Sequence, residues 1–163
     1  MDEDRVAQIA DQWRRERPDL DPDPLLIIGR IQHLAEALDG ALRPPFAAAD
    51  LGNGDFDVLA ALRREGQPYT LTAGQLSERM LVTTGAVTKR VDRLIRRGLV
   101  SRAVSEGDAR GRVVGLTPAG KTLTDRLIEE HLANEAAILS RLSDSDRRNL
   151  ERLLATLTSV VKR

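Results

Sequence analysis

Basic and hydroxyl side chains recur at helical spacing between residues 83 and 97, where they could bind an anionic polymer. Lysine and arginine pair with phosphate, and both can also contact base edges, as can threonine. At about 100° per residue, the outward face of this helix, nearly opposite its apolar stripe, carries Gly85, Lys89, Arg93 and Arg96. An ordinary solvated helix face is the alternative interpretation. The residues of this helix that we expect to contact DNA are Thr83, Thr84, Gly85, Thr88, Lys89, Arg93 and Arg96.

This basic face requires a helix that is packed on its other side. Val87, Val91 and Leu94 recur at i, i+4 and i+7, and Gly98 stands where a left-handed residue commonly ends a helix. A shorter helix precedes it, because residues 72–75 have the form of a capping box. Two helices joined by a tight turn predict a helix-turn-helix, whose second helix can enter the major groove of DNA.

A β-hairpin is predicted directly after the basic helix. Residues 99–104 alternate in the manner of a strand, residues 107–111 form a turn, and residues 112–116 form the returning strand. Arg110 lies at the tip, a position suited to a narrow minor groove, where the negative potential is strongest. A solvent-exposed hairpin arginine is the alternative, but the preceding helix-turn-helix favours a wing that contacts DNA. We therefore add Arg110 and Arg112 to the expected DNA-binding residues.

Amphipathic helices are predicted on both sides of this core. Apolar residues recur with helical spacing in residues 6–13, 27–42, 118–142 and about 143–161, and the stripe in 27–42 should belong to the core. These stripes offer more apolar surface than a small winged domain can cover. A further helix runs from Asp55 to about Glu65. We expect one mainly α-helical domain over residues 1–163 with a small β wing: residues 1–45 and 117–163 form a dimerisation region, and residues 54–116 form the winged helix-turn-helix.

Charge is concentrated in the middle of the chain. The 163 residues carry no formal net charge, but residues 72–121 hold ten basic and four acidic side chains, a net charge of +6. Because the distribution of charge matters more than its sum, this segment favours contact with nucleic acid.

The composition argues against several other kinds of chemistry. Without a cysteine, the chain has no disulfide, no thiolate metal site and no thiol nucleophile. Its two histidines, His33 and His131, are isolated, so we expect no catalytic residue, no metal and no cofactor. The charged N-terminal segment and the lack of a long apolar stretch predict a cytoplasmic protein without membrane contact.

The segment from residue 71 to 121 resembles the winged-helix core of the MarR family of bacterial transcription regulators. The resemblance implies that Asp108 steadies a wing-tip arginine, Arg110. Ala109 stands where family members commonly carry a second arginine, which leaves Arg110 as the wing-tip contact. The shared pattern consists of Asp92-Arg93-Leu94, Gly98-Leu99-Val100, Arg102, Asp108-Ala109-Arg110 and Leu116-Thr117 with Gly120.

A narrower resemblance concerns the segments outside that core. The stretches QWRRERPDLD, IGRIQHLA and FDVLAALRREGQPYTL are similar to the urate-responsive, PecS-like branch of the family. Guanidinium groups can bind an anion, and an indole can contact a flat ring. Simpler roles remain open: a core tryptophan, a structural ion pair, or an arginine that touches phosphate. The ligand-binding roles of that branch fall on Trp13, Asp57, Arg90 and Arg102.

Together these patterns predict a DNA-binding transcription regulator that binds an inverted-repeat operator as a homodimer and acts as a repressor. The resemblance further implies release from DNA by a small anionic effector, urate or a related purine. The alternatives are a phenolic or carboxylic acid effector, such as an aconitate, or a winged-helix module used only for protein contacts. An enzyme is the least supported class.

Overall fold

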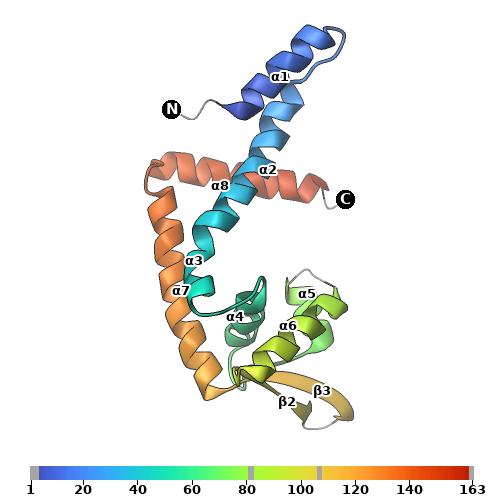
Figure 1. Ribbon diagram of the computed structural model, residues 1–163, viewed down its shortest axis with the longest axis vertical. Coiled ribbons are helices and arrows are strands. Elements are labelled where there is room, and N and C mark those ends of the chain that lie inside the picture. The colour runs from blue at the N-terminus through green and yellow to red at the C-terminus, as the bar shows by residue number, and fades with distance from the viewer. Residues whose placement is uncertain (1–3, 81–82, 106–107, 162–163) are drawn as a thin grey trace. The chain divides into compact units, whose positions relative to one another are not determined.

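The computed structural model describes residues 4–80, 83–105 and 108–161 (Figure 1). Its contacts divide the chain into two compact units, Met1–Pro44 and Pro45–Arg163, which we describe in turn. The expectation of a single domain over residues 1–163 stays a prediction.

The first unit is a pair of helices, α1 (Arg5–Glu16) and α2 (Asp23–Leu42). Asp4 caps α1 by accepting a hydrogen bond from the Ala7 backbone N–H, as a short acidic side chain commonly does at this position. The two helices pack closely, since a Cβ added to Gly29 would lie 3.0 Å from Val6 Cγ1.

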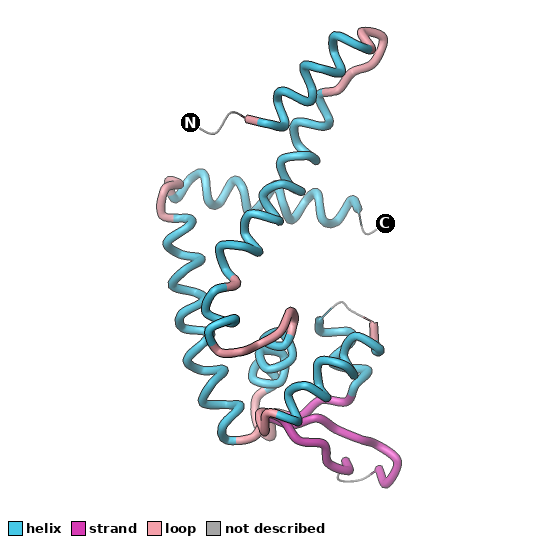
Figure 2. Tube along the Cα trace, in the orientation of Figure 1, coloured by secondary structure: helices cyan, strands magenta, loops and turns pink. Residues whose placement is uncertain are grey.

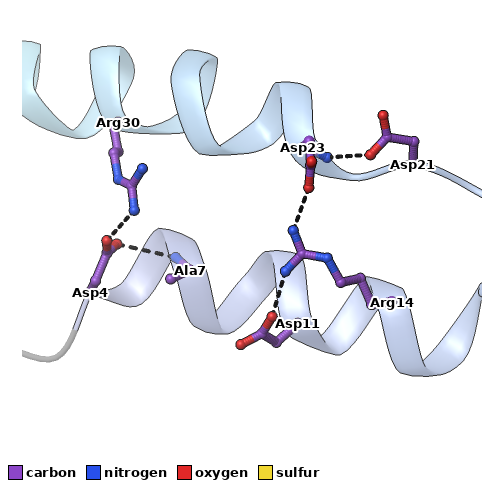
Figure 3. A network of polar contacts seen from close by, with 7 residues as sticks. All are labelled: Asp4, Ala7, Asp11, Arg14, Asp21, Asp23 and Arg30. Carbon is purple, nitrogen blue, oxygen red and sulfur yellow. Dashed lines mark hydrogen bonds and ion pairs between the residues drawn. The ribbon is translucent and has the colours of Figure 1, made fainter.

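Ion pairs also join the two helices of this unit. Figure 3 shows Arg30 bound to Asp4, and Arg14 bound to both Asp11 and Asp23. All five side chains are half exposed, so these pairs orient the helices more than they stabilise them.

The expectation that the apolar stripe of α2 belongs to the core was wrong for the single chain that the structure describes. No residue of α2 is buried, and Ile27 and Leu34 are 62% and 53% exposed. A 20-residue helix has apolar surface along its whole length, and within this unit only the shorter α1 packs against it.

The second unit contains the predicted winged helix-turn-helix. The elements of this unit are α3 (Pro44–Ala48), α4 (Asp55–Glu65), β1 (Thr70–Thr72), α5 (Ala73–Met80), α6 (Thr84–Arg96), β2 (Val100–Ser105), β3 (Asp108–Leu116), α7 (Pro118–Leu139) and α8 (Asp144–Val161).

Three antiparallel strands, magenta in Figure 2, form a sheet in the order β1-β3-β2, in which Leu71 and Arg102 both lie opposite Val114. The buried core comes from α4, α5, α6, α7 and the sheet. Its members include Leu59, Leu62, Leu76, Val87, Val91, Leu94 and Leu127.

Local signals in the sequence define the ends of these helices. The capping box is formed: the Thr72 backbone N–H donates to Gln75 Oε1 at 2.8 Å, and the Gln75 N–H donates to Thr72 Oγ1 at 3.2 Å. Thr83 caps α6 by accepting from the Ala86 N–H at 3.4 Å. Gly98 ends the helix with φ of +68°, the left-handed conformation that glycine adopts without steric cost.

Several elements differ from the sequence-based expectation. Strand β1 was not predicted, because its three residues are too few to show a period and its partner β3 lies more than forty residues away. Helix α3 was not predicted either. Its first two residues are prolines, which end the preceding helix and also fit the first turn of a new one. Strand β3 begins at Asp108, within the predicted turn, and α7 ends at Leu139 rather than near Leu142.

The fold class, mainly α with a small β wing, is confirmed. Within the described ranges, no helix is long and apolar enough to cross a membrane.

Candidate DNA-binding and ligand-binding sites

The predicted DNA-contacting residues of α6 lie mainly on its exposed face. Gly85, Thr88, Lys89 and Arg96 are exposed, and the Arg96 Nε–H donates to the Asp92 carbonyl of the same helix at 3.3 Å. Thr83, which caps the helix, is also exposed, as is Arg112 on β3. The side chains of Thr84, Asp108 and Arg110 lie outside the described part of the structure, which gives only their place in α6 and β3.

Arg93, which was also predicted to contact DNA, binds a residue at the start of α4. Its Nη2 lies 2.6 Å from Asp55 Oδ1, and its Nε lies 3.2 Å from Asp55 Oδ2. The Asp55 side chain is only 2% exposed, and it also accepts a hydrogen bond from the Gly52 N–H at 2.9 Å. The carboxylate of Asp55 raises the pKa of Arg93. Direct contact between Arg93 and DNA stays a prediction.

Two further arginines, Arg90 of α6 and Arg97 at its C-cap, contact the same stretch of chain, residues 49–57, which we call the anchor segment. The Arg97 Nη2 donates to the Ala49 carbonyl at 2.8 Å, and its Nε lies 3.7 Å from an Asp50 carboxylate oxygen. The guanidinium of Arg90 lies against Gly54, because a Cβ at that glycine would fall 2.1 Å from Arg90 Cζ. Three arginines therefore join α6 to the segment that begins α4.

Arg90 is also close to Asp57, its expected partner in the ligand site. Its Nη1 lies 3.6 Å from Asp57 Oδ2, an ion pair that is longer than a hydrogen bond. That Nη1 atom is buried and has no hydrogen-bond partner among the described residues. The Arg90 side chain is 19% exposed, whereas that of Asp57 is 61% exposed. A partly buried cation thus has an incomplete set of partners.

The other two predicted ligand residues are placed differently. Arg102 extends from β2 to Asp92 on α6, with 2.9 Å between Nη2 and Oδ1, so its ion pair is with that residue and not with Asp57. Trp13 belongs to α1 of the first unit, where it is 49% exposed. The structure therefore brings together Asp57 and Arg90, and the convergence of all four residues stays a prediction.

A pocket of about 500 Å³ lies beside the anchor segment and includes Asp57 in its lining. Phe46 and Phe56 stack on one side, with 4.4 Å between ring centroids, and His131 lies 5.2 Å from the Phe46 ring. The His131 Nδ1 is buried and has no hydrogen-bond partner within the described structure. The remaining lining residues are Ala60, Arg63, Arg64, Arg79, Met80, Thr124 and Ile128.

No cluster of three or more potential metal ligands occurs among the residues whose placement is described. The described structure shows exposed cations on one face of α6 and a pocket that is bordered by aromatic rings and arginines.

Comparison with known proteins identifies the family. Residues 49–111 match the model of the MarR family. The transcriptional regulator PecS of Dickeya dadantii (strain 3937) is 40% identical over 149 residues, which are 91% of this chain and 90% of PecS. The chain belongs to the MarR family. As the sequence predicted, it resembles the PecS branch of that family, and it is a DNA-binding transcription regulator rather than an enzyme.

Two solved structures of MarR-family proteins extend this comparison. A mutant of MarR from Escherichia coli, solved with operator DNA, has the same fold, with a TM-score of 0.71 at 24% identity over 89% of this chain and 96% of that one. NadR, solved with 4-hydroxyphenylacetate, is 29% identical, with a TM-score of 0.63 over 81% of this chain and 91% of that one.

Sequence reasoning missed the anchor contacts of this MarR-family chain. Asp55 was noted only as the start of a helix, and Arg97 was not assigned a role. The available signal was the helical spacing of Asp55 with Leu59 and Leu62, at i, i+4 and i+7, which puts the carboxylate on the apolar face of its helix, where it needs a partner. The pocket gave no sequence signal, since its residues come from α3, α4, α5 and α7.

Proposed function

We propose that this MarR-family chain is a dimeric repressor that binds an inverted-repeat operator and is released from it by a small planar anion. Its DNA-reading surface is the exposed face of α6, with Lys89 at its centre, supported by Arg112 on the wing. The operator complex of the E. coli MarR mutant, which has the same fold, supports this use of the winged helix.

Dimerisation is supported by apolar surface that the single chain leaves exposed. Helix α8 presents Leu150, Leu153, Leu154, Val160 and Val161 to solvent, and α2 presents Ile27, Ile28 and Leu34. Monomeric proteins rarely expose contiguous apolar surface of this kind, because burying it is favourable by about 25 cal/mol per Å². A two-fold dimer would present two α6 helices to successive major grooves, about 34 Å apart, and would thus match an inverted repeat.

The observation that carries the ligand proposal is the incomplete pairing of Arg90. Its buried Nη1 has only a distant, exposed carboxylate nearby, so an anion entering beside Asp57 gains a charge-assisted hydrogen bond that the empty protein lacks. The neighbouring pocket of about 500 Å³ has room for a flat ring, and two stacked phenylalanines form one of its walls. Urate or a related purine fits this description.

Release from DNA follows if the anion binds better to one arrangement of α6 than to another. When the anion draws Arg90 away from Asp57, α6 loses one of its contacts with the anchor segment. A small rotation of α6 in each protomer is enough to change the spacing of the two reading helices, and the dimer then no longer matches successive grooves.

The test is a fluorescence anisotropy titration with duplex DNA from the region upstream of the gene. The unmodified protein should bind this DNA and release it as urate is added, and Arg90→Ala should blunt the release. Affinity for DNA is measured without urate for both proteins, so that a phosphate contact by Arg90 is separated from its ligand role. An unchanged urate response in Arg90→Ala would contradict the assignment.

The second effector class is a phenolic or carboxylic acid, and the NadR complex with 4-hydroxyphenylacetate favours testing it. Quenching of the single tryptophan, Trp13, by urate, xanthine, 4-hydroxyphenylacetate and citrate compares the classes directly. If only the last two quench, the effector is an organic acid and the purine proposal is wrong.

A further inference from the structure

The arginines that bind the anchor segment form a row on α6. Arg90, Arg93 and Arg97 are spaced at i, i+3 and i+7, which places them within about 60° of one another on the helix. The exposed face with Lys89 begins beside this row. Helical spacing in the sequence placed Arg93 with Lys89 on the face expected to contact DNA, although its angle also lies within about 60° of Arg90 and Arg97.

The contacts of Arg93 assign it to the row that holds the protein together. Two of its guanidinium nitrogens meet two oxygens of one carboxylate, a fork geometry that fixes the direction of both side chains. A Cβ at Gly52 would lie 3.1 Å from that carboxylate and 3.3 Å from Arg93 Nε, so the backbone is closely fitted around the pair.

Asp55 has the properties of a fixed attachment point. It is almost fully buried, and an unpaired carboxylate in such a place is strongly disfavoured. It is also the first residue of α4, whose N-cap, Gly54, provides no side-chain hydrogen bond. One carboxylate therefore binds the start of α4, the Gly52 N–H and the reading helix together.

We propose that Arg93 is a positioning residue, which sets the orientation of α6 through Asp55 and does not itself neutralise a phosphate. The inference rests on the proposed use of α6 as the DNA-reading helix, and it replaces the direct DNA contact that the sequence predicted for Arg93. Its consequence runs against simple electrostatics: a buried negative charge at Asp55 strengthens binding to a polyanion.

The salt dependence of DNA binding separates positioning from contact. Each phosphate contact that is lost lowers the slope of log K against log salt concentration by about 0.9 for duplex DNA. Lys89→Gln, at an exposed site, should lower the slope by about that amount. Arg93→Gln should weaken binding at least tenfold at one salt concentration, with the slope of the unmodified protein.

Asp55→Asn tests whether removal of this negative charge strengthens or weakens DNA binding. Removal of a negative charge near DNA should leave binding unchanged or strengthen it if only charge matters, whereas loss of the attachment point should weaken it about tenfold or more. In the double variant Asp55→Asn with Arg93→Gln, the two losses should not add, because both remove one interaction.

Arg93→Lys keeps the charge and loses the fork, so it should bind DNA nearly as weakly as Arg93→Gln. Thermal unfolding followed by circular dichroism shows whether each variant is folded at the assay temperature. If Asp55→Asn is not folded, Arg93→Lys still tests the proposal. A slope lowered in Arg93→Gln as in Lys89→Gln, or normal binding by Arg93→Lys, overturns the proposal. If the unmodified protein shows no salt-dependent binding, the proposed function fails as well.

Discussion

The guanidinium of Arg90 lies against the backbone of Gly54, so closely that a single added methyl group at this glycine would overlap it. Gly54 has φ of +74° and is the N-cap of α4, directly before the segment that holds Asp55 and Asp57, the partners of Arg93 and Arg90. The position of Arg90, the arginine of the proposed ligand site, therefore depends on the absence of a side chain at Gly54.

Gly54→Ala should displace Arg90 and weaken the response to urate. The change should also lower the free energy of unfolding by more than the roughly 1 kcal/mol expected for alanine at positive φ alone. Gly98→Ala is the control, because Gly98 also has a positive φ, of +68°, and a Cβ added there would have no neighbour within 4 Å. Urea denaturation and the anisotropy titration measure both effects, and equal behaviour of the two variants would show that the Arg90 contact has no influence.

Asp57→Asn should strengthen urate binding, in contrast to Arg90→Ala. The Asp57 carboxylate competes with the anion for the Arg90 guanidinium, and a long ion pair whose carboxylate is largely exposed contributes about 0.2–1 kcal/mol, or up to about fivefold in affinity. Isothermal titration calorimetry with urate measures the change. Asp144→Asn, which removes a similarly long and exposed pair with Arg147, should leave the affinity as it is. Weaker binding in Asp57→Asn would mean that the carboxylate holds the ligand directly.

Acid should destabilise the contact between α4 and α7 through Asp125. Lys121 and Arg63 both donate to its carboxylate, at 2.7 Å and 2.6 Å, and they lower the pKa of Asp125. Asp125 binds a proton more readily in the unfolded chain than in the folded protein. Its ion pairs therefore stabilise the folded protein fully above the ordinary aspartate pKa of about 4, and this stabilisation is lost as pH falls through the lowered pKa of Asp125. Asp125→Asn should flatten the fall in melting temperature over that acid range. An identical pH profile for both proteins would contradict this role.

Leu153→Glu should separate the proposed dimer into monomers. A carboxylate placed at the centre of the apolar face of α8 cannot be buried without a partner, and the several kcal/mol that this costs correspond to at least about a 100-fold weaker dimer. Light scattering coupled to size-exclusion chromatography measures the mass. Arg148→Glu, on the opposite side of α8 by helical spacing, should remain dimeric. Dimers in both cases would remove α8 from the interface.

The sequence was sufficient for the helix-turn-helix and for those helix ends that have a clear capping signal. The capping box at Thr72 and Gln75 and the left-handed Gly98 are each decided within a few residues, and the structure confirms both. The helix-turn-helix and its wing follow from these signals and from the +6 segment, and they carry the resemblance to the MarR family.

Only the tertiary structure decided which partners the functional side chains have. Helical periodicity gives the direction of Arg93 on α6, but its partner Asp55 lies 38 residues earlier in the sequence. The same holds for Arg102, which pairs with Asp92, and for the pocket built from four helices. Ion pairs and cavities form between elements that packing brings together, and packing depends on the whole core. A local pattern therefore determined the recognition helix, whereas the fold determined what holds it in place.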